Sequence, residues 1–145
     1  MSIKNHHRVG RHVEKIKQDD EGNPTFKAFV FIAKHKGNLS ANWLDYFSKF
    51  DEDGKLREVV KDLQTVRTVI EGDKLALFVH KDLKRVGEKF HPSCKLAARH
   101  QSAKGNPNRS HSLIYTDEKY LKTSNQRYKM AVLLSETYSD LKEIP

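Results

Sequence analysis

The stretch KLALFVHK, residues 74–81, follows the turn EGDK and predicts a β-strand, because it is a short apolar run bounded by turn residues. A second run, FKAFVFIAK at residues 26–34, has the aromatic and β-branched content and the length of a buried strand. Between the two runs, residues 55–70 carry an apolar stripe at helical spacing, with Lys, Asp and Arg on the opposite side. This interleaving of strands and helices favours a fold that mixes both.

The segments around these runs predict further elements. Ser40 is expected to cap a helix over residues 41–50, which the turn DEDG at 51–54 separates from the helix at 55–70. Downstream we expect a short helix or irregular segment at 82–90, strands at 94–101 and 111–116, and a helix at 125–144.

No strict βαβ rhythm and no internal repeat connects these elements. The sequence therefore predicts a single α+β domain at residues 22–145, with a small mixed or antiparallel sheet covered by helices. The polar residues 1–21 are expected to form a flexible N-terminal arm.

Composition limits the classes of protein that remain. Hydrophobic residues make up 37% of the 145 and charged residues 32%, so a compact core must lie under a thick polar surface. The single cysteine, Cys94, excludes an intrachain disulfide and fits a reducing cytosol. No signal peptide is apparent, and no run approaches the roughly 20 apolar residues of a membrane span. We expect a cytoplasmic protein with no membrane association.

The positive charge is unevenly distributed. Residues 81–129 contain twelve Lys or Arg against four Asp or Glu, and this excess equals the formal net charge of the whole chain, +8. A segment that collects all of the net charge indicates a binding site for something anionic.

Two segments resemble a family of small bacterial proteins that has no established activity. The family pairs an LSxNWLEYF-like segment, here LSANWLDYF at 39–47, with a later H…NPSHxxI-like segment, here His100 followed by NRSHSLI at 108–114. Arg109 stands where the family usually has proline. The resemblance covers roughly residues 22–116 and implies a shared design; it suggests an accessory subunit of a bacterial defence or mobile-element system.

His100 and His111 are the candidate catalytic residues. We expect each at a strand end, flanking the loop SAKGNPNRS, so that the two face each other across one mouth. One imidazole would accept a 2′-hydroxyl proton and the other would protonate the leaving oxygen, with an arginine or lysine stabilising the phosphate charge. This hypothesis describes a metal-independent ribonuclease or phosphoesterase. The alternative is that both histidines are structural.

No cofactor or metal site is expected. The histidines occur singly or near the N-terminus, without HExxH, CxxC or HxH spacing, and one cysteine cannot build a thiolate zinc site. The seven glycines are isolated, so no nucleotide-binding loop is present.

The basic segment is expected to bind nucleic acid, with RNA or single-stranded DNA favoured. Its basic residues would neutralise phosphates, while interleaved aromatic and histidine side chains would stack on unpaired bases. The candidate nucleic-acid-binding residues are Arg85, Lys89, Lys95, Arg99, Lys104 and Arg109. The alternative is a solvated surface that keeps the protein soluble.

A protein partner is the third hypothesis. Trp43 and Tyr46, with Phe47 and Phe50, would form an aromatic helix face on which a partner docks if it is exposed. Aromatic residues at helical spacing also serve as core, so this face has two readings. Binding without turnover, phosphoester cleavage and partner docking all stay open at the level of the sequence.

Overall fold

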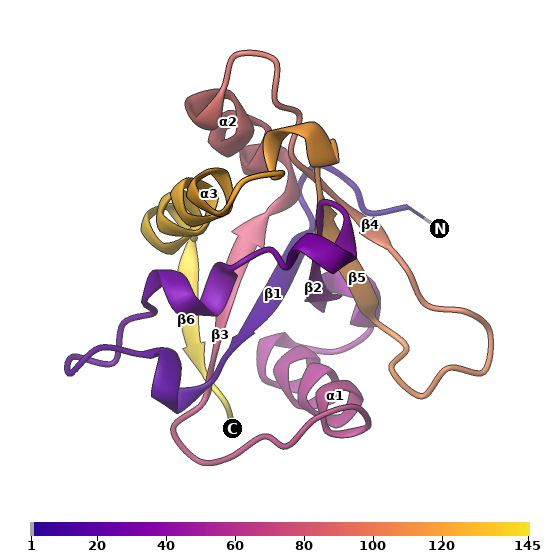
Figure 1. Ribbon diagram of the computed structural model, residues 1–145. Coiled ribbons are helices and arrows are strands. Elements are labelled where there is room, and N and C mark those ends of the chain that lie inside the picture. The colour runs from indigo at the N-terminus through magenta and orange to yellow at the C-terminus, as the bar shows by residue number, and fades with distance from the viewer. Residues whose placement is uncertain (1) are drawn as a thin grey trace.

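The strand predicted at residues 74–81 is present in the structure, a computed structural model that describes residues 2–145. It is β3 (Lys74–Val79), and it belongs to a six-stranded sheet of order β4-β5-β2-β1-β3-β6 in which every neighbouring pair is antiparallel (Figure 1). The other strands are β1 (Arg8–Val13), β2 (Asn38–Trp43), β4 (Ala97–His100), β5 (His111–Tyr115) and β6 (Asp140–Glu143).

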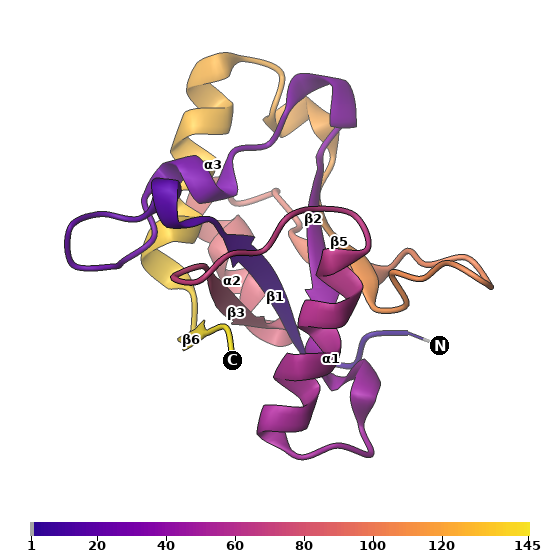
Figure 2. The ribbon, with the colours of Figure 1, turned by 90° about the horizontal axis from the view of Figure 1, so that it is seen from below.

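Helices cover both faces of the sheet. Helices α2 (His80–Phe90) and α3 (Ser124–Thr137) pack on one face, and α1 (Glu52–Gln64) packs on the other (Figure 2). The short 3-10 helices of the described chain are η1 (Lys15–Lys17), η2 (Phe26–Phe29), η3 (Ala33–His35), η4 (Leu44–Phe47) and η5 (Glu118–Tyr120). The predicted α+β class is confirmed, and the sheet is antiparallel.

Strand β3 shows why the core has two halves. Its side chains alternate, so Ala76 and Phe78 join the larger cluster under α2 and α3, whereas Leu75 and Leu77 join the smaller cluster under α1. Both faces of β3 are therefore buried, which explains why its sequence is a continuous apolar run.

The prediction of a strand at residues 26–34 is wrong. This segment forms η2, an extended stretch and η3, with no partner strand among residues 2–145. Its aromatic residues are nevertheless core: Phe29 and Phe31 are buried, and Phe26 stacks edge-on against Tyr128 of α3. Aromatic and β-branched residues are common both in strands and in buried irregular segments, so the composition of residues 26–34 did not distinguish the two.

The prediction of a helix that begins after Ser40 is also wrong. Residues 38–43 form β2, in which Leu39, Ala41 and Trp43 point to the α2 and α3 face, and η4 follows at once. Buried side chains alternate along β2, and the tight turn of η4 follows directly. Together they place apolar residues at spacings that resemble those of a helix. The turn at 51–54 proved to be the start of α1, where the Asp51 carboxylate accepts a hydrogen bond from the Gly54 amide at 2.8 Å.

Strand β1 lies within the segment expected to be an arm outside the domain. It pairs with β3 along its whole length and with β2 at Val9 and Gly10, and both Val9 and Val13 are fully buried. Only two valines in this strand are obviously apolar, so the pattern was too weak to predict it from the sequence.

Downstream, the predictions hold more closely. Strands β4 and β5 occupy the segments predicted at 94–101 and 111–116, and residues 82–90 belong to α2. Helix α3 is confirmed, but it ends at Thr137, and β6 then adds an edge strand beside β3.

Candidate functional site

The sheet register separates the two candidate catalytic histidines. His111 pairs with Asn42 of β2, and His100 pairs with Ser112 of β5. Because paired residues share a face and successive residues alternate, His111 points to the α1 face, whereas His100 points to the face under α2 and α3. The expectation that the two imidazoles face one mouth is therefore not met.

Each imidazole also has its own local partners. His100 Nε2 is hydrogen-bonded to the carbonyl of Arg109 at 2.8 Å, and its ring packs on Trp43 and Tyr46 at centroid distances of 5.3 and 5.2 Å. His111 Nε2 is hydrogen-bonded to Ser40 Oγ at 2.9 Å. His100 thus serves packing, and His111 alone remains on an accessible face.

The six candidate basic residues fall into three groups. Arg85 and Lys89 are exposed on α2. Lys95, Arg99 and Lys104 are exposed just before β4, on β4 and in the loop after it, respectively. Arg109 differs, because its guanidinium binds the carboxylate of Asp62 through Nε at 2.9 Å and Nη2 at 2.8 Å.

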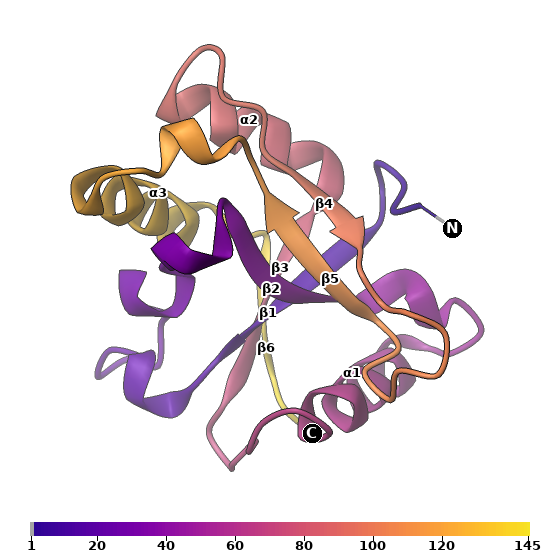
Figure 3. The same cartoon turned by 45° about the vertical axis from the view of Figure 1, so that its right-hand side comes forward.

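Arg109 fixes the loop between β4 and β5. Asp62 is fully buried on α1 and also accepts hydrogen bonds from the backbone amide and hydroxyl of Ser110. Burial lowers the pKa of Arg109, but the Asp62 carboxylate outweighs that effect and raises it overall. The charge of Arg109, whose side chain is 42% exposed, is thereby paired with Asp62, and Glu58 lies 3.5 Å away; the loop is held close to α1 (Figure 3). Arg109 is a structural residue in this arrangement.

The aromatic face expected to dock a partner is closed. The indole of Trp43 is 3% exposed within the larger core cluster and contacts the rings of His7, Tyr46 and His100. Tyr46 is half-buried beside it. Trp43 and Tyr46 thus close one end of the core, and Phe50, at 47% exposed, is the residue of the predicted face that remains largely outside it.

The sheet does leave one surface uncovered. Helix α1 packs over β3 and reaches the Asn42 end of β2, where Asn42 is buried, and the rest of the α1 side of β2, β5 and β4 carries half-buried or exposed side chains. The opposite side of the same strands is almost entirely buried, through Leu39, Ala41, Ser112, Ile114 and Ala98. We call the uncovered surface the open face; its residues are Asn38, Ser40, Arg99, His111, Leu113 and Tyr115.

An aromatic ring and a guanidinium lie together on the open face. The Arg99 guanidinium carbon stands 4.7 Å from the centroid of the Tyr115 ring, which is a cation–π contact. Arg99 on edge strand β4 pairs with Leu113 of β5, two positions before Tyr115, so Arg99 and Tyr115 are diagonal neighbours on one face of the sheet. This pair presents a flat, positively charged surface.

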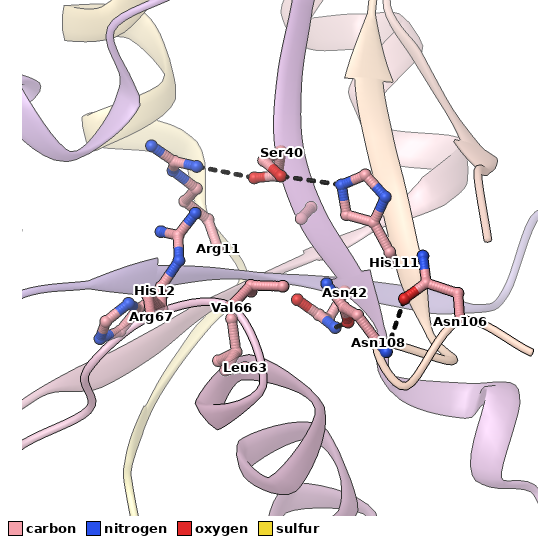
Figure 4. A pocket seen from close by; sticks show the side chains of 11 residues that line it. Arg11, His12, Ser40, Asn42, Leu63, Val66, Arg67, Asn106, Asn108 and His111 are labelled. Carbon is pink, nitrogen blue, oxygen red and sulfur yellow. Dashed lines mark hydrogen bonds between the residues drawn. The ribbon is translucent and has the colours of Figure 1, made fainter.

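A pocket of about 250 Å³ adjoins the open face where β1 and β2 diverge. Figure 4 shows Arg11 and Arg67 on one side of it and His111, Asn106 and Asn108 on the other. A second hollow, lined by His35, Asn38 and Leu113, shares Ser40 and His111 with the first. Within residues 2–145, no Asp or Glu lines either one.

Arg11 is the central cation of this pocket. Strands β1 and β2 pair only between Val9–Gly10 and the end of β2 at Asn42–Trp43. The Arg11 side chain lies in the gap beyond this pairing and donates from Nε to the Ala28 carbonyl at 2.9 Å and from Nη1 to the Ser40 carbonyl at 2.8 Å. Burial, with the nearby charge of Arg67, lowers the pKa of Arg11 to about 10, which still leaves it protonated at neutral pH.

Sequence reasoning missed Arg11 and Arg67. One lay in the expected arm and the other in the expected helix at 55–70, and 56 positions separate them in the chain. No local spacing connects them; only the pairing of β1 with the sheet and the early end of α1 at Gln64 bring them to one pocket.

The thiol and possible metal ligands give no reaction centre. Cys94 is buried, and burial raises the pKa of its thiol, which disfavours the reactive thiolate. In the described part of the chain, no three His, Cys, Asp or Glu side chains group so as to hold a metal ion. No helix between residues 2 and 145 is both long and apolar enough to cross a membrane.

Comparison with known proteins gives no relative from which a role could be transferred. No protein-family model, curated protein or solved structure matches this chain.

Proposed function

We propose that this is a cytoplasmic protein that binds single-stranded nucleic acid across the open face. The observation that carries the proposal is the burial pattern of β2, β5 and β4: one side is core, and the other side is left uncovered with Arg99, Tyr115 and His111 on it. A solvated surface would not need an aromatic ring at that position.

The chemistry of the open face fits unpaired bases better than a duplex. A half-buried tyrosine ring with an exposed arginine guanidinium lying over it offers a stacking surface to a base, because bases stack on both aromatic rings and guanidinium planes. Arg99 and Lys104 would neutralise phosphates along the β4 edge. Since neither hollow is lined by an acidic side chain, nothing in them repels a polyanion.

The two alternative functions have weaker support. His100 and His111 point to opposite faces, so a paired acid and base at one phosphate is not supported by the geometry. Trp43 is core, which leaves the partner-docking hypothesis with Phe50 as its largely exposed aromatic residue.

Direct binding measurements test the proposal. Labelled single-stranded RNA, single-stranded DNA and duplex DNA of matched sequence are titrated with the protein in EDTA. We expect the single strands to bind more tightly than the duplex. Replacing Tyr115 with Ala should weaken binding about tenfold, the effect expected from loss of one stacked base.

The matched control is Tyr128→Ala. Tyr128 is 50% exposed, but it lies on α3, on the other side of the sheet. This variant should bind as the wild type does. Equal losses in both variants, or no binding of any single strand at low salt, would contradict the proposal.

A further inference from the structure

The pocket beside the open face contains an uncompensated positive charge. Within the described chain, the Arg11 guanidinium donates to two backbone carbonyls and forms no ion pair with a carboxylate. Glu14, the acidic residue whose charge it feels, is paired with Lys17 at 3.1 Å. A partly buried cation held only by neutral dipoles is costly unless an anion completes the site.

A second cation lies close enough to increase that cost. The charge of Arg67 acts directly on Arg11, and in residues 2–145 the Arg67 side chain has no ion-pair partner. Two guanidinium groups around one hollow form an arrangement suited to a phosphate, because Arg67 can donate two parallel hydrogen bonds to its oxygens and Arg11 keeps Nη2 as a donor beside its two carbonyl contacts.

Neutral donors complete the opposite wall. Asn106 Oδ1 accepts a hydrogen bond from the backbone amide of Asn108 at 2.9 Å, and this contact leaves the Asn106 amide group available as a donor beside His111 (Figure 4). Asn42, in contrast, uses its amide on Asn108 and Ser110 and so stabilises the wall itself.

The position of the pocket determines which phosphate can reach it. A strand that crosses the open face from β4 over β5 to β2 arrives at the pocket and there meets Leu63 and Val66 near the end of α1. Helix α1 covers the sheet beyond this point, so the strand cannot continue along the surface. The pocket is therefore the place where a path along the sheet surface ends.

We propose that Arg11 and Arg67, with Asn106 and His111, bind the terminal phosphate of the single strand that occupies the open face. This inference rests on the proposed function and specifies the strand end that it selects. A terminal phosphomonoester suits two arginines better than an internal phosphodiester, because near neutral pH it carries about −1.5 to −2 charge, against −1 for the diester.

The test compares three short oligonucleotides of one sequence, ending in 5′-phosphate, in 3′-phosphate or in hydroxyls at both ends. For the wild-type protein, one phosphorylated form should bind at least about tenfold more tightly than the hydroxyl form, the effect of roughly one charge-assisted hydrogen bond. Arg67→Ala should abolish this difference. Arg57→Ala, which removes an exposed arginine of α1 outside the pocket, should retain it.

Inorganic phosphate provides an independent measurement by NMR titration. It should shift the backbone amide signals of Ser40, Asn106 and His111 in the wild type and leave them unchanged in Arg67→Ala. Absence of these shifts in the wild type overturns the phosphate site.

The remaining outcomes separate this inference from the proposed function. If all three oligonucleotides bind equally well, the strand-end assignment is overturned while single-strand binding stands. If phosphate shifts the pocket signals but no oligonucleotide binds, the proposed function fails, and the strand-end assignment fails with it.

Discussion

Asp62 is the residue on which the shape of the open face depends most directly. Its carboxylate is fully buried and accepts hydrogen bonds from Arg109 and from the amide and hydroxyl of Ser110, at 2.6 to 2.9 Å. A buried carboxylate is stable only when such donors surround it. Through these contacts α1 holds the β4–β5 loop, which supplies Asn106 and Asn108 to the pocket.

Replacing Asp62 with Asn should destabilise the protein by about 3 kcal/mol, because an amide cannot accept hydrogen bonds from all of these donors and leaves Arg109 only the longer contact with Glu58 at 3.5 Å. Urea unfolding followed by circular dichroism measures the change. Glu88→Gln serves as the control, because Glu88 is exposed on α2 and should alter stability by less than about 0.5 kcal/mol. A change of similar size in both variants would show that Asp62 has no special role.

At the scale of elements, Asp45 joins three of them. It lies on η4 and accepts hydrogen bonds from the backbone and guanidinium of Arg8 on β1 and from Lys55 on α1, at 2.7 to 3.1 Å. Burial alone would raise the pKa of Asp45, but these hydrogen bonds outweigh it and hold the pKa well below its usual range.

This lowered pKa predicts a loss of stability in acid. The folded state binds the Asp45 proton less tightly than the unfolded state does, so its contribution is present above the unfolded pKa of about 4 and is lost as the pH falls through the folded pKa. Asp45→Asn should cost about 2 kcal/mol at neutral pH and flatten the decline in acid. Urea midpoints across a pH series measure both effects. Asp20→Asn, which changes an exposed turn residue, should reproduce the wild-type curve.

The elements that the sequence predicted correctly are those with a strong local signal. The apolar run of β3 and the turn-bounded β5 were located nearly to the residue, as was the start of α3. The predictions for residues 26–34 and 38–47 were wrong because their apolar patterns fit more than one kind of element. A buried irregular segment resembles a strand in composition, and a strand followed by a turn resembles a helix in spacing. Strand β1 has little apolar signal of its own, and its strand form depends on β3 and β2 beside it.

The candidate site was predicted less completely than the fold. Charge counting located Arg99 and Lys104, and the loop signal located His111 next to them. The charge count also included Arg109 among the candidate binding residues, although its counterion Asp62 lies 47 residues earlier in the chain. Ion pairing and strand register are tertiary properties, so the sequence could not separate free cations from neutralised ones, nor one face of a strand from the other.

At the scale of the whole molecule, the fold divides the basic segment between two sides. Arg99 and Lys104 belong to the β4–β5 hairpin beside the open face, whereas Arg85 and Lys89 lie on α2, which packs on the opposite face. A general attraction of the net charge of +8 would use both groups alike. A bound strand on the open face would use only the first group.

The salt dependence of binding distinguishes these two possibilities. Each phosphate neutralised on a single strand contributes about −0.7 to the slope of log K against log salt concentration. Arg99→Ala should therefore reduce the magnitude of the slope by about 0.7. Arg85→Ala removes the same formal charge from an exposed residue and should leave the slope unchanged. Fluorescence anisotropy with a labelled single strand over a salt series gives both slopes. Equal reductions would mean that the strand responds to the overall charge and not to the open face, because only a defined path across the sheet can make two exposed arginines differ.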